Sequence, residues 1–143
     1  MKRSVIDASA LMAALLPGEP LKEKARDILG SYVKGEIELW APSLLLYEVA
    51  NSLLKAERRK GGGVSPKAID AILGEIEGLE TPLVDVPPVR VVRAARKYGI
   101  WGYDASYLAL AEEEEIPLIT ADKRLYNSVK RRFQRIQYLG GKS

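Results

Sequence analysis

Two short apolar runs of this chain end at an aspartate, and residues that favour a helix follow each of them. The first run is Ser4-Val5-Ile6, before Asp7, and the second covers residues 117–121, before Asp122. Apolar segments that alternate with helical patterns predict a parallel sheet covered by helices on both faces. In such sheets ligands bind at the carboxyl ends of strands, so the two aspartates are candidates to face each other.

The alternation continues along the whole chain. We expect strands near 3–6, 37–40, 82–86, 117–121 and 136–139. We expect helices over 8–16, 20–34, 43–60, 66–78, 88–98, 104–115 and 123–132. A chain of 143 residues is long enough for one domain with a real core. The sequence therefore predicts an α/β fold with a central parallel sheet and a single domain over residues 1–143.

The residue types that are missing exclude several kinds of chemistry. The chain has no cysteine and no histidine, which excludes disulfides, thiolate nucleophiles, Ser-His-Asp catalysis and imidazole metal ligands. Acid–base and metal-ligand chemistry then depends mainly on carboxylates. No apolar run approaches the ~20 residues of a membrane span, so we expect a cytoplasmic protein without a membrane partner.

Positive charge is concentrated in three parts of the chain, although the net charge is only +3. Basic residues dominate between residues 122 and 143. The other two groups are Lys55, Arg58, Arg59 and Lys60, and Arg90, Arg93, Arg96 and Lys97. Basic margins around an acidic centre suit a polyanionic substrate, but each group alone is also typical of a solvated helix face.

Asp7 and Asp122 each stand where an expected helix begins. An aspartate at that position is a good N-cap for free N–H groups, so each has a purely structural interpretation as well. Ser9 lies close enough to Asp7 to contact a metal-bound water or a phosphate. Thr120 lies two residues before Asp122, on the same side of an extended chain.

Glu48 belongs to an expected amphipathic helix. The apolar half of that helix comprises Leu45, Leu46, Val49, Ala50, Leu53 and Leu54. Glu48 and Asn51 fall on the other half, three positions apart. They either face water or present a carboxylate and an amide to one site.

Asp104 begins a segment, 104–111, that is apolar nearly all round and should be buried. An unpaired buried charge is unfavourable, so its carboxylate must be a cap or a ligand. Two carboxylates ~6 Å apart repel by roughly 2–3 kcal/mol at an effective dielectric of ~20. A cluster of all four acids would therefore bind a cation or raise some pKa values. A cation held only by oxygens is usually Mg²⁺ or Mn²⁺, which indicates metal-dependent chemistry on phosphate.

Four segments together resemble the PIN domain, and most closely the toxin ribonucleases called VapC. They cover residues 5–11, 42–51, 103–111 and 117–125, in the order that the family has. The resemblance implies a three-layer α/β/α fold and an Mg²⁺- or Mn²⁺-dependent ribonuclease site. It implies that the metal ligands, direct or through water, are Asp7, Glu48, Asp104 and Asp122. The supporting residues would be Thr120, Ser9 and Asn51.

The resemblance also suggests partners. An RNA substrate would be held by basic residues, for which Lys123, Arg124, Arg131 and Arg132 are the candidates. Tyr47, Trp101 and Tyr103 are expected in the core, with stacking on unpaired bases as the alternative. The family further implies a homodimer and a cognate antitoxin protein, whose helix would enter a groove near the apolar helices at 11–16 and 44–54.

Other functions stay open. A PIN nuclease of RNA maturation, without an antitoxin, would carry the same acids. A phosphatase of the haloacid-dehalogenase type needs Asp-x-Asp after the first strand, and here Ser9 occupies the second position. A binding module without catalysis is disfavoured by the presence of all four acids. The sequence therefore favours a metal-dependent endoribonuclease that acts as the toxin of a toxin–antitoxin pair.

Overall fold

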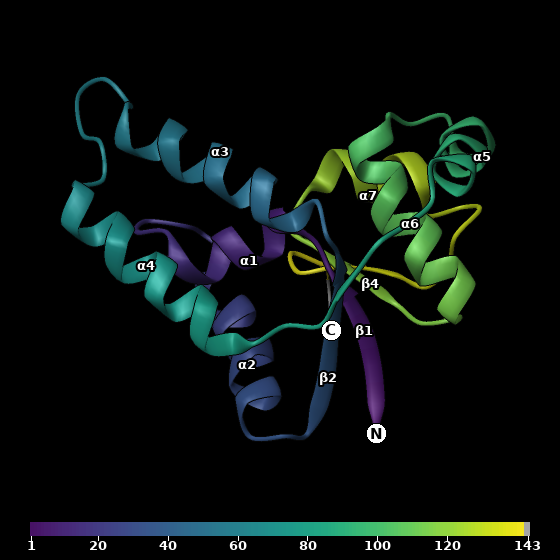
Figure 1. Cartoon of the computed structure of the whole chain (residues 1–143), viewed down its shortest axis with the longest axis horizontal. Helices are drawn as coiled ribbons and strands as arrows, with labels where there is room; N and C mark the ends of the chain where they lie inside the picture. Colours follow the sequence, from purple (N-terminus) through teal and green to yellow (C-terminus); the bar gives the residue numbers. More distant parts are fainter. Residues whose placement is uncertain (142–143) are drawn as a thin grey trace.

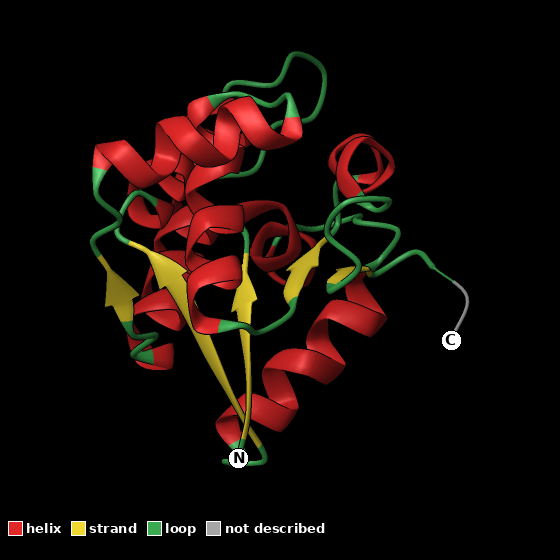
Figure 2. Cartoon of the chain, turned by 90° about the vertical axis from the view of Figure 1, so that its right-hand side faces the viewer, coloured by secondary structure: helices red, strands yellow, loops and turns green. Residues whose placement is uncertain are grey.

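In the computed structural model, which describes residues 1–141, a five-stranded sheet lies between layers of helices (Figure 1). Its strands are β1 (Lys2–Ile6), β2 (Ile37–Pro42), β3 (Leu83–Val84), β4 (Leu118–Thr120) and β5 (Ile136–Tyr138). The order across the sheet is β3-β2-β1-β4-β5, and every neighbouring pair is parallel. All arrows in Figure 2 therefore point toward the same edge, the carboxyl edge of the sheet. The expected α/β/α architecture with a central parallel sheet is confirmed.

Helices form the crossovers that parallel strands require. They are α1 (Ala8–Leu15), α2 (Lys22–Val33), α3 (Leu45–Glu57), α4 (Pro66–Leu79), α5 (Pro88–Tyr98), α6 (Gly102–Glu114) and α7 (Lys123–Val129). On one face α1 and α2 contact the sheet, and on the other face α6 does, with α5 packed against it. Figure 1 shows α1–α4 on the left of the sheet and α5 and α6 on its right.

The strand order places a switch point between β1 and β4. From β1 the chain moves outward to β2 and β3, and it then returns to the other side of β1 for β4 and β5. At such a point the two crossovers leave in opposite directions and open a crevice at the carboxyl edge. The two aspartates that follow apolar runs stand at this crevice, because Asp7 follows β1 and Asp122 comes shortly after β4.

Burial follows the expected pattern at the centre of the molecule. Seven of the eight residues of α1 are buried, and so is the segment 105–111 of α6. These two helices face opposite sides of β1 and β4, so neither has a broad polar side. The sequence prediction that the helix after Asp104 is buried is confirmed.

Two details differ from the sequence prediction. The strand expected at 82–86 is reduced to Leu83–Val84, because it is an edge strand with prolines at 82 and 87, which cannot donate to a ladder. The expected apolar half of α3 is only partly covered. Leu45, Val49 and Leu53 are buried, whereas Leu46 and Leu54 are exposed by 48% and 42%. This helix lies at the outside of its layer, against α1 and α4, and buries only a narrow stripe.

None of the helices in residues 1–141 is both long enough and apolar enough to cross a membrane.

Candidate active site at the carboxyl edge of the sheet

Four separate elements bring the four acids to one cavity. Asp7 follows β1 and Asp122 precedes α7, while Glu48 and Asp104 lie in the first turns of α3 and α6. The backbone N–H of Asp7 donates to the carbonyl of Ile119 over 3.1 Å, which ties the end of β1 to β4. The cavity has a volume of about 190 Å³, and it is lined by Asp7, Ala8, Ser9, Glu48, Ser52, Asp104, Tyr107 and Asp122.

Asp7 is both a helix cap and a wall of this cavity. Its Oδ1 accepts hydrogen bonds from the backbone N–H of Ala10 over 2.9 Å and from the Ser9 hydroxyl over 2.6 Å. The side chain is buried, with 5% of the residue exposed. Burial raises the pKa of this carboxyl to about 6, and the nearby hydroxyl groups of Ser9 and Thr120 and the N–H of Ala10 offset only part of that rise. Asp7 therefore caps α1 and lines the candidate site at the same time.

A chain of hydroxyl groups fixes the direction of the Asp7 carboxylate. The Ser9 hydroxyl donates to Asp7, so the hydroxyl of Thr120, 3.2 Å away, can donate to Ser9. Ser9 Oγ accepts from the N–H of Ala121, and Thr120 Oγ1 accepts from the N–H of Asp122. Thr120 is fully buried. These bonds join the ends of β1 and β4 and leave both hydroxyl groups little freedom to turn.

Asp122 also caps its own helix. Its Oδ1 accepts from the N–H groups of Arg124 and Leu125, at 2.9 and 3.2 Å. As at Asp7, a cap at the end of a strand holds the carboxylate beside the cavity. The two interpretations open for these aspartates in the sequence do not exclude each other.

Glu48 has a partner that the sequence reasoning missed. The hydroxyl of Tyr107, on α6, donates to Glu48 Oε1 over 2.6 Å. Tyr107 is buried, and burial together with the Glu48 charge raises the pKa of its phenol. The phenol therefore stays protonated and acts as a donor. The available signal was a tyrosine inside an otherwise apolar helix, because a buried hydroxyl needs a hydrogen-bond partner.

Asp104 is half-buried and carries the clearest sign of crowded negative charge. Its pKa is raised mainly by burial, and next by the charges of Asp122 and Glu48. Within residues 1–141, however, no three acidic side chains already converge closely enough to form a complete metal site. The carboxylates line one polar space and do not yet surround one point. Water molecules, or small side-chain movements, would have to complete the coordination of an ion.

The other candidates divide between the cavity and the surface. Ser9 lies in the wall, and Thr120 stands behind it. Asn51 is exposed and is absent from the lining, where Ser52, four positions after Glu48 on the same helical face, takes the place proposed for it. Lys123 and Arg124 are exposed directly after Asp122.

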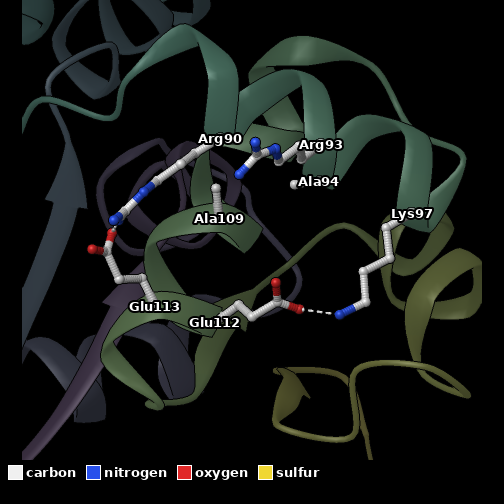
Figure 3. A pocket seen from close by; sticks show the side chains of 7 residues that line it. All are labelled: Arg90, Arg93, Ala94, Lys97, Ala109, Glu112 and Glu113. Carbon is white, nitrogen blue, oxygen red and sulfur yellow. Dashed lines mark hydrogen bonds and ion pairs between the residues drawn. The ribbon is translucent and has the colours of Figure 1, made fainter.

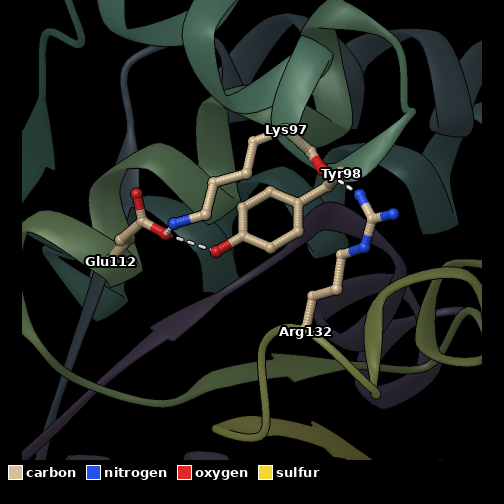
Figure 4. A network of polar contacts seen from close by, with 4 residues as sticks. All are labelled: Lys97, Tyr98, Glu112 and Arg132. Carbon is tan, nitrogen blue, oxygen red and sulfur yellow. Dashed lines mark hydrogen bonds and ion pairs between the residues drawn. The ribbon is translucent and has the colours of Figure 1, made fainter.

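Much of the basic surface farther from the cavity is engaged in local contacts. Arg132 donates to the backbone carbonyl of Lys97 (Figure 4), whereas Arg131 is exposed. Lys97 pairs with Glu112, which also accepts from the hydroxyl of Tyr98. Figure 3 shows the adjoining hollow between α5 and α6, where the side chains of Arg90 and Glu113 form a second pair. Glutamates of α6 thus neutralise part of the positive charge of the basic group at residues 90–97.

A parallel sheet with a carboxylate-lined cavity at its switch point defines an α/β protein with a candidate acidic catalytic site. The family model of the PIN domain matches residues 4–130, and the chain belongs to this family. The resemblance found in the sequence is confirmed.

Two curated relatives come from Pyrobaculum aerophilum. Ribonuclease VapC3 is 33% identical over 125 residues, which cover 85% of this chain and 90% of the relative. Exonuclease VapC9 is 29% identical over 128 residues, which cover 88% of this chain and 85% of the relative.

Solved structures share the fold. The crystal structure of PAE2754 from Pyrobaculum aerophilum has a TM-score of 0.66 at 30% sequence identity, and the match covers 89% of this chain and 79% of that one. The structure of FitAcB from Neisseria gonorrhoeae has a TM-score of 0.58 at 14% identity, and covers 89% and 93%. At that identity the second match bears on the fold alone.

Proposed function

We propose that this protein is a metal-dependent endoribonuclease of the VapC type, the toxin of a toxin–antitoxin pair. The observation that carries the proposal is the cavity at the switch point, where four elements supply Asp7, Glu48, Asp104 and Asp122. The relatives named Ribonuclease VapC3 and Exonuclease VapC9 support nuclease activity and an RNA substrate.

The donor set suits a hard divalent cation. The walls offer carboxylate and hydroxyl oxygens, and the chain has no histidine or cysteine that would favour a softer metal. The raised pKa values of Asp7 and Asp104 reflect burial and mutual repulsion, both of which a bound cation offsets. Mg²⁺ or Mn²⁺ would be held by the four acids, directly or through water.

Each residue then has a distinct part in phosphodiester hydrolysis. A divalent ion at this place would polarise the scissile phosphate and lower the pKa of the attacking water. A carboxylate oxygen of the site accepts the proton of that water. The hydroxyl chain from Thr120 through Ser9 orients Asp7, and Tyr107 orients Glu48. Lys123 and Arg124 bind neighbouring phosphates, with a smaller contribution from Arg131 and Arg132.

We also propose an antitoxin partner and a homodimer. An apolar hollow of about 210 Å³ between α1, α3 and α4 supports the antitoxin, and its apolar lining consists of Leu11, Leu45, Leu46, Ile76 and Leu83. It lies where the sequence predicted a groove for an antitoxin helix.

The test of the proposed function is cleavage of RNA by the purified protein with Mg²⁺ or Mn²⁺, with EDTA, and as the Asp104→Asn variant. We expect cleavage with either ion, none in EDTA, restoration by added metal, and a loss of at least about a hundredfold in the variant. Asp70→Asn is a matched control, because it removes the same charge from an exposed position of α4. A closed circular RNA among the substrates reports endonucleolytic cutting, since an exonuclease leaves it intact.

Cleavage that persists in EDTA would contradict the metal requirement. Equal cleavage by Asp104→Asn and Asp70→Asn would show that the cavity is not the site. Attack on linear RNA alone would leave a nuclease but overturn the endonucleolytic assignment.

Replacement of Tyr107 by phenylalanine isolates the support of Glu48. The ring still fills its place, but the Glu48 carboxylate loses the hydrogen bond that the Tyr107 hydroxyl donates to it. A hydrogen bond to a charged group such as this one contributes about 1.5–3 kcal/mol. We expect cleavage to fall by about tenfold or more while the fold is kept, measured as kcat/KM and by urea denaturation. Tyr98→Phe removes a similar tyrosine–glutamate bond away from the cavity and should leave kcat/KM unchanged. Equal activity losses in both variants would contradict a specific role for Tyr107.

A further inference from the structure

Three aromatic residues are largely exposed to solvent, contrary to the prediction that they pack in the core. Trp101 is exposed by 90%, Tyr47 by 77% and Tyr103 by 69%. All other aromatic residues of the chain are buried or half-buried. We call these three residues the aromatic rim. An exposed aromatic ring forgoes the large gain of burying 150–250 Å² of surface, so a cluster of them indicates a ligand.

The three residues of the aromatic rim stand at the starts of the two helices that supply Glu48 and Asp104 to the acidic cavity. Tyr47 directly precedes Glu48 in the first turn of α3. Trp101 is the N-cap residue of α6, and Tyr103 directly precedes Asp104 in its first turn. The hydrogen bond from Tyr107 to Glu48 joins the two helices at the cavity, and both begin above the carboxyl edge of the sheet in Figure 1. The rings therefore project from the same helix turns as two of the acids assigned to the reaction.

Local structure does not explain these rings. The side chain of Trp101 makes no capping hydrogen bond to α6. The aromatic pairs within residues 1–141 are Tyr98–Phe133 and Tyr126–Tyr138, and neither includes a member of the rim. The ring faces are thus available to a molecule that approaches the cavity.

We infer that the three residues of the aromatic rim form a platform on which unpaired bases of the RNA substrate stack beside the acidic cavity. This inference rests on the proposed nuclease function. The faces of bases inside a duplex are covered by their neighbours, whereas unpaired bases can stack on tyrosine and tryptophan rings. Such stacking tolerates any base, because every base has a π-face.

The charges around the rim favour a nucleic acid over a protein. Glu48 and Asp104 interrupt it, and a protein interface would have to strip water from both carboxylates, whereas interface cores are depleted of charge. A nucleotide brings a phosphate, which a cation can bridge to these same acids. Lys123 and Arg124 stand exposed beside Asp122, and neither forms an ion pair within residues 1–141. They supply positive charge for the adjoining phosphates.

The test is binding of short RNA to the full chain, measured in the cleavage-deficient Asp7→Asn protein. The probes are an unstructured octamer of mixed sequence and a blunt duplex of the same composition. Fluorescence reports on Trp101, because the other tryptophan, Trp40, is half-buried beneath the guanidinium of Arg3 at 4.7 Å. We expect the octamer to quench this fluorescence and to bind at least about tenfold more tightly than the duplex.

Substitutions separate stacking from other contacts. Trp101→Ala and Tyr103→Ala should each weaken octamer binding about tenfold and affect duplex binding little, while Trp101→Phe should keep most of the affinity. The control is Val33→Ala, which removes an apolar side chain exposed by 72% at the end of α2, just before β2 and away from the carboxyl edge. It should leave binding unchanged.

Equal binding by Trp101→Ala and the parent, or equal affinity for octamer and duplex, would overturn the aromatic rim as a base platform. Metal-dependent cleavage by the unmodified protein would then still support the nuclease. If Trp101→Ala instead turned a dimer into a monomer by light scattering, with RNA binding unchanged, the rim would be an interface between copies. If the parent neither bound nor cleaved RNA, the proposed function would fail as well.

Discussion

Replacing Asp7 by asparagine is expected to reduce RNA cleavage by about a thousandfold and, without divalent metal, to make the protein more stable at pH 7. The loss of activity follows because asparagine is a neutral and weak ligand for a hard cation, and metal ions contribute several kcal/mol to such reactions. The gain in stability follows from the burial of a carboxylate whose pKa is raised to about 6. Both effects arise because the substitution removes the negative charge of a buried carboxylate.

The sign of the stability effect can be worked out from linkage. Between the ordinary value of 3.8 and about 6, the folded protein holds a proton on Asp7 more tightly than the unfolded chain does. The free energy of unfolding therefore falls as the pH rises through this window, by about 3 kcal/mol in all, and stays lower at pH 7. Asparagine does not titrate and remains a good N-cap, so the variant avoids this loss.

The measurement is urea denaturation of the parent and Asp7→Asn at pH 4 and pH 7 in EDTA, with cleavage assays of both. We expect the variant to be more stable by about 2–3 kcal/mol at pH 7 and by much less at pH 4. Asp7→Ala, which lacks the bond to Ala10, should gain about 1 kcal/mol less. Near-normal cleavage by Asp7→Asn would remove Asp7 from the site, and a pH-independent stability difference would show that its carboxyl is well solvated.

The sequence predicted both the order of the elements and the position of the acids, because both follow from apolar runs that end where a helix begins. Asp7 and Asp122 stand where an apolar run meets a helix, and a parallel sheet brings the ends of its strands to one edge. Asp104 was identified because an acid at the start of an apolar helix needs a partner. Their meeting in one cavity depends on the β3-β2-β1-β4-β5 order, which local pattern does not specify.

What sequence reasoning missed depends on contacts between elements. Sequence pattern predicts Tyr107 as a core residue, and it is buried, but its hydroxyl also donates a hydrogen bond to Glu48, which lies 59 residues earlier in the chain. Ser52, not Asn51, lines the cavity, because the rotation of α3 about its axis is set by packing against α1 and α4. The exposure of Trp101 was also unexpected, since hydrophobicity alone assigns a tryptophan to the core.

Affinity for Mn²⁺ is expected to fall at least about tenfold between pH 7 and pH 5. A carboxyl with a pKa of about 6 is ionised in about ten of eleven molecules at pH 7 and in about one of eleven at pH 5. Only the ionised form is a good ligand, so binding must release the proton wherever Asp7 still holds one. The raised pKa of Asp104 steepens the dependence, because burial and the charges of Asp122 and Glu48 also favour its protonated form.

Titration calorimetry at pH 5, 6 and 7 measures both parts of this expectation. Repeating each titration in two buffers of different ionisation enthalpy gives the number of protons released, which should be at least about one near pH 5 and small at pH 7. Asp7→Asn should bind Mn²⁺ weakly at every pH and show a shallower pH dependence, left by Asp104 alone. Tight binding that neither weakens at pH 5 nor releases protons would place the ion away from Asp7. The same burial that destabilises the empty site thus makes its occupation sensitive to pH, because the proton and the cation compete for one buried carboxylate.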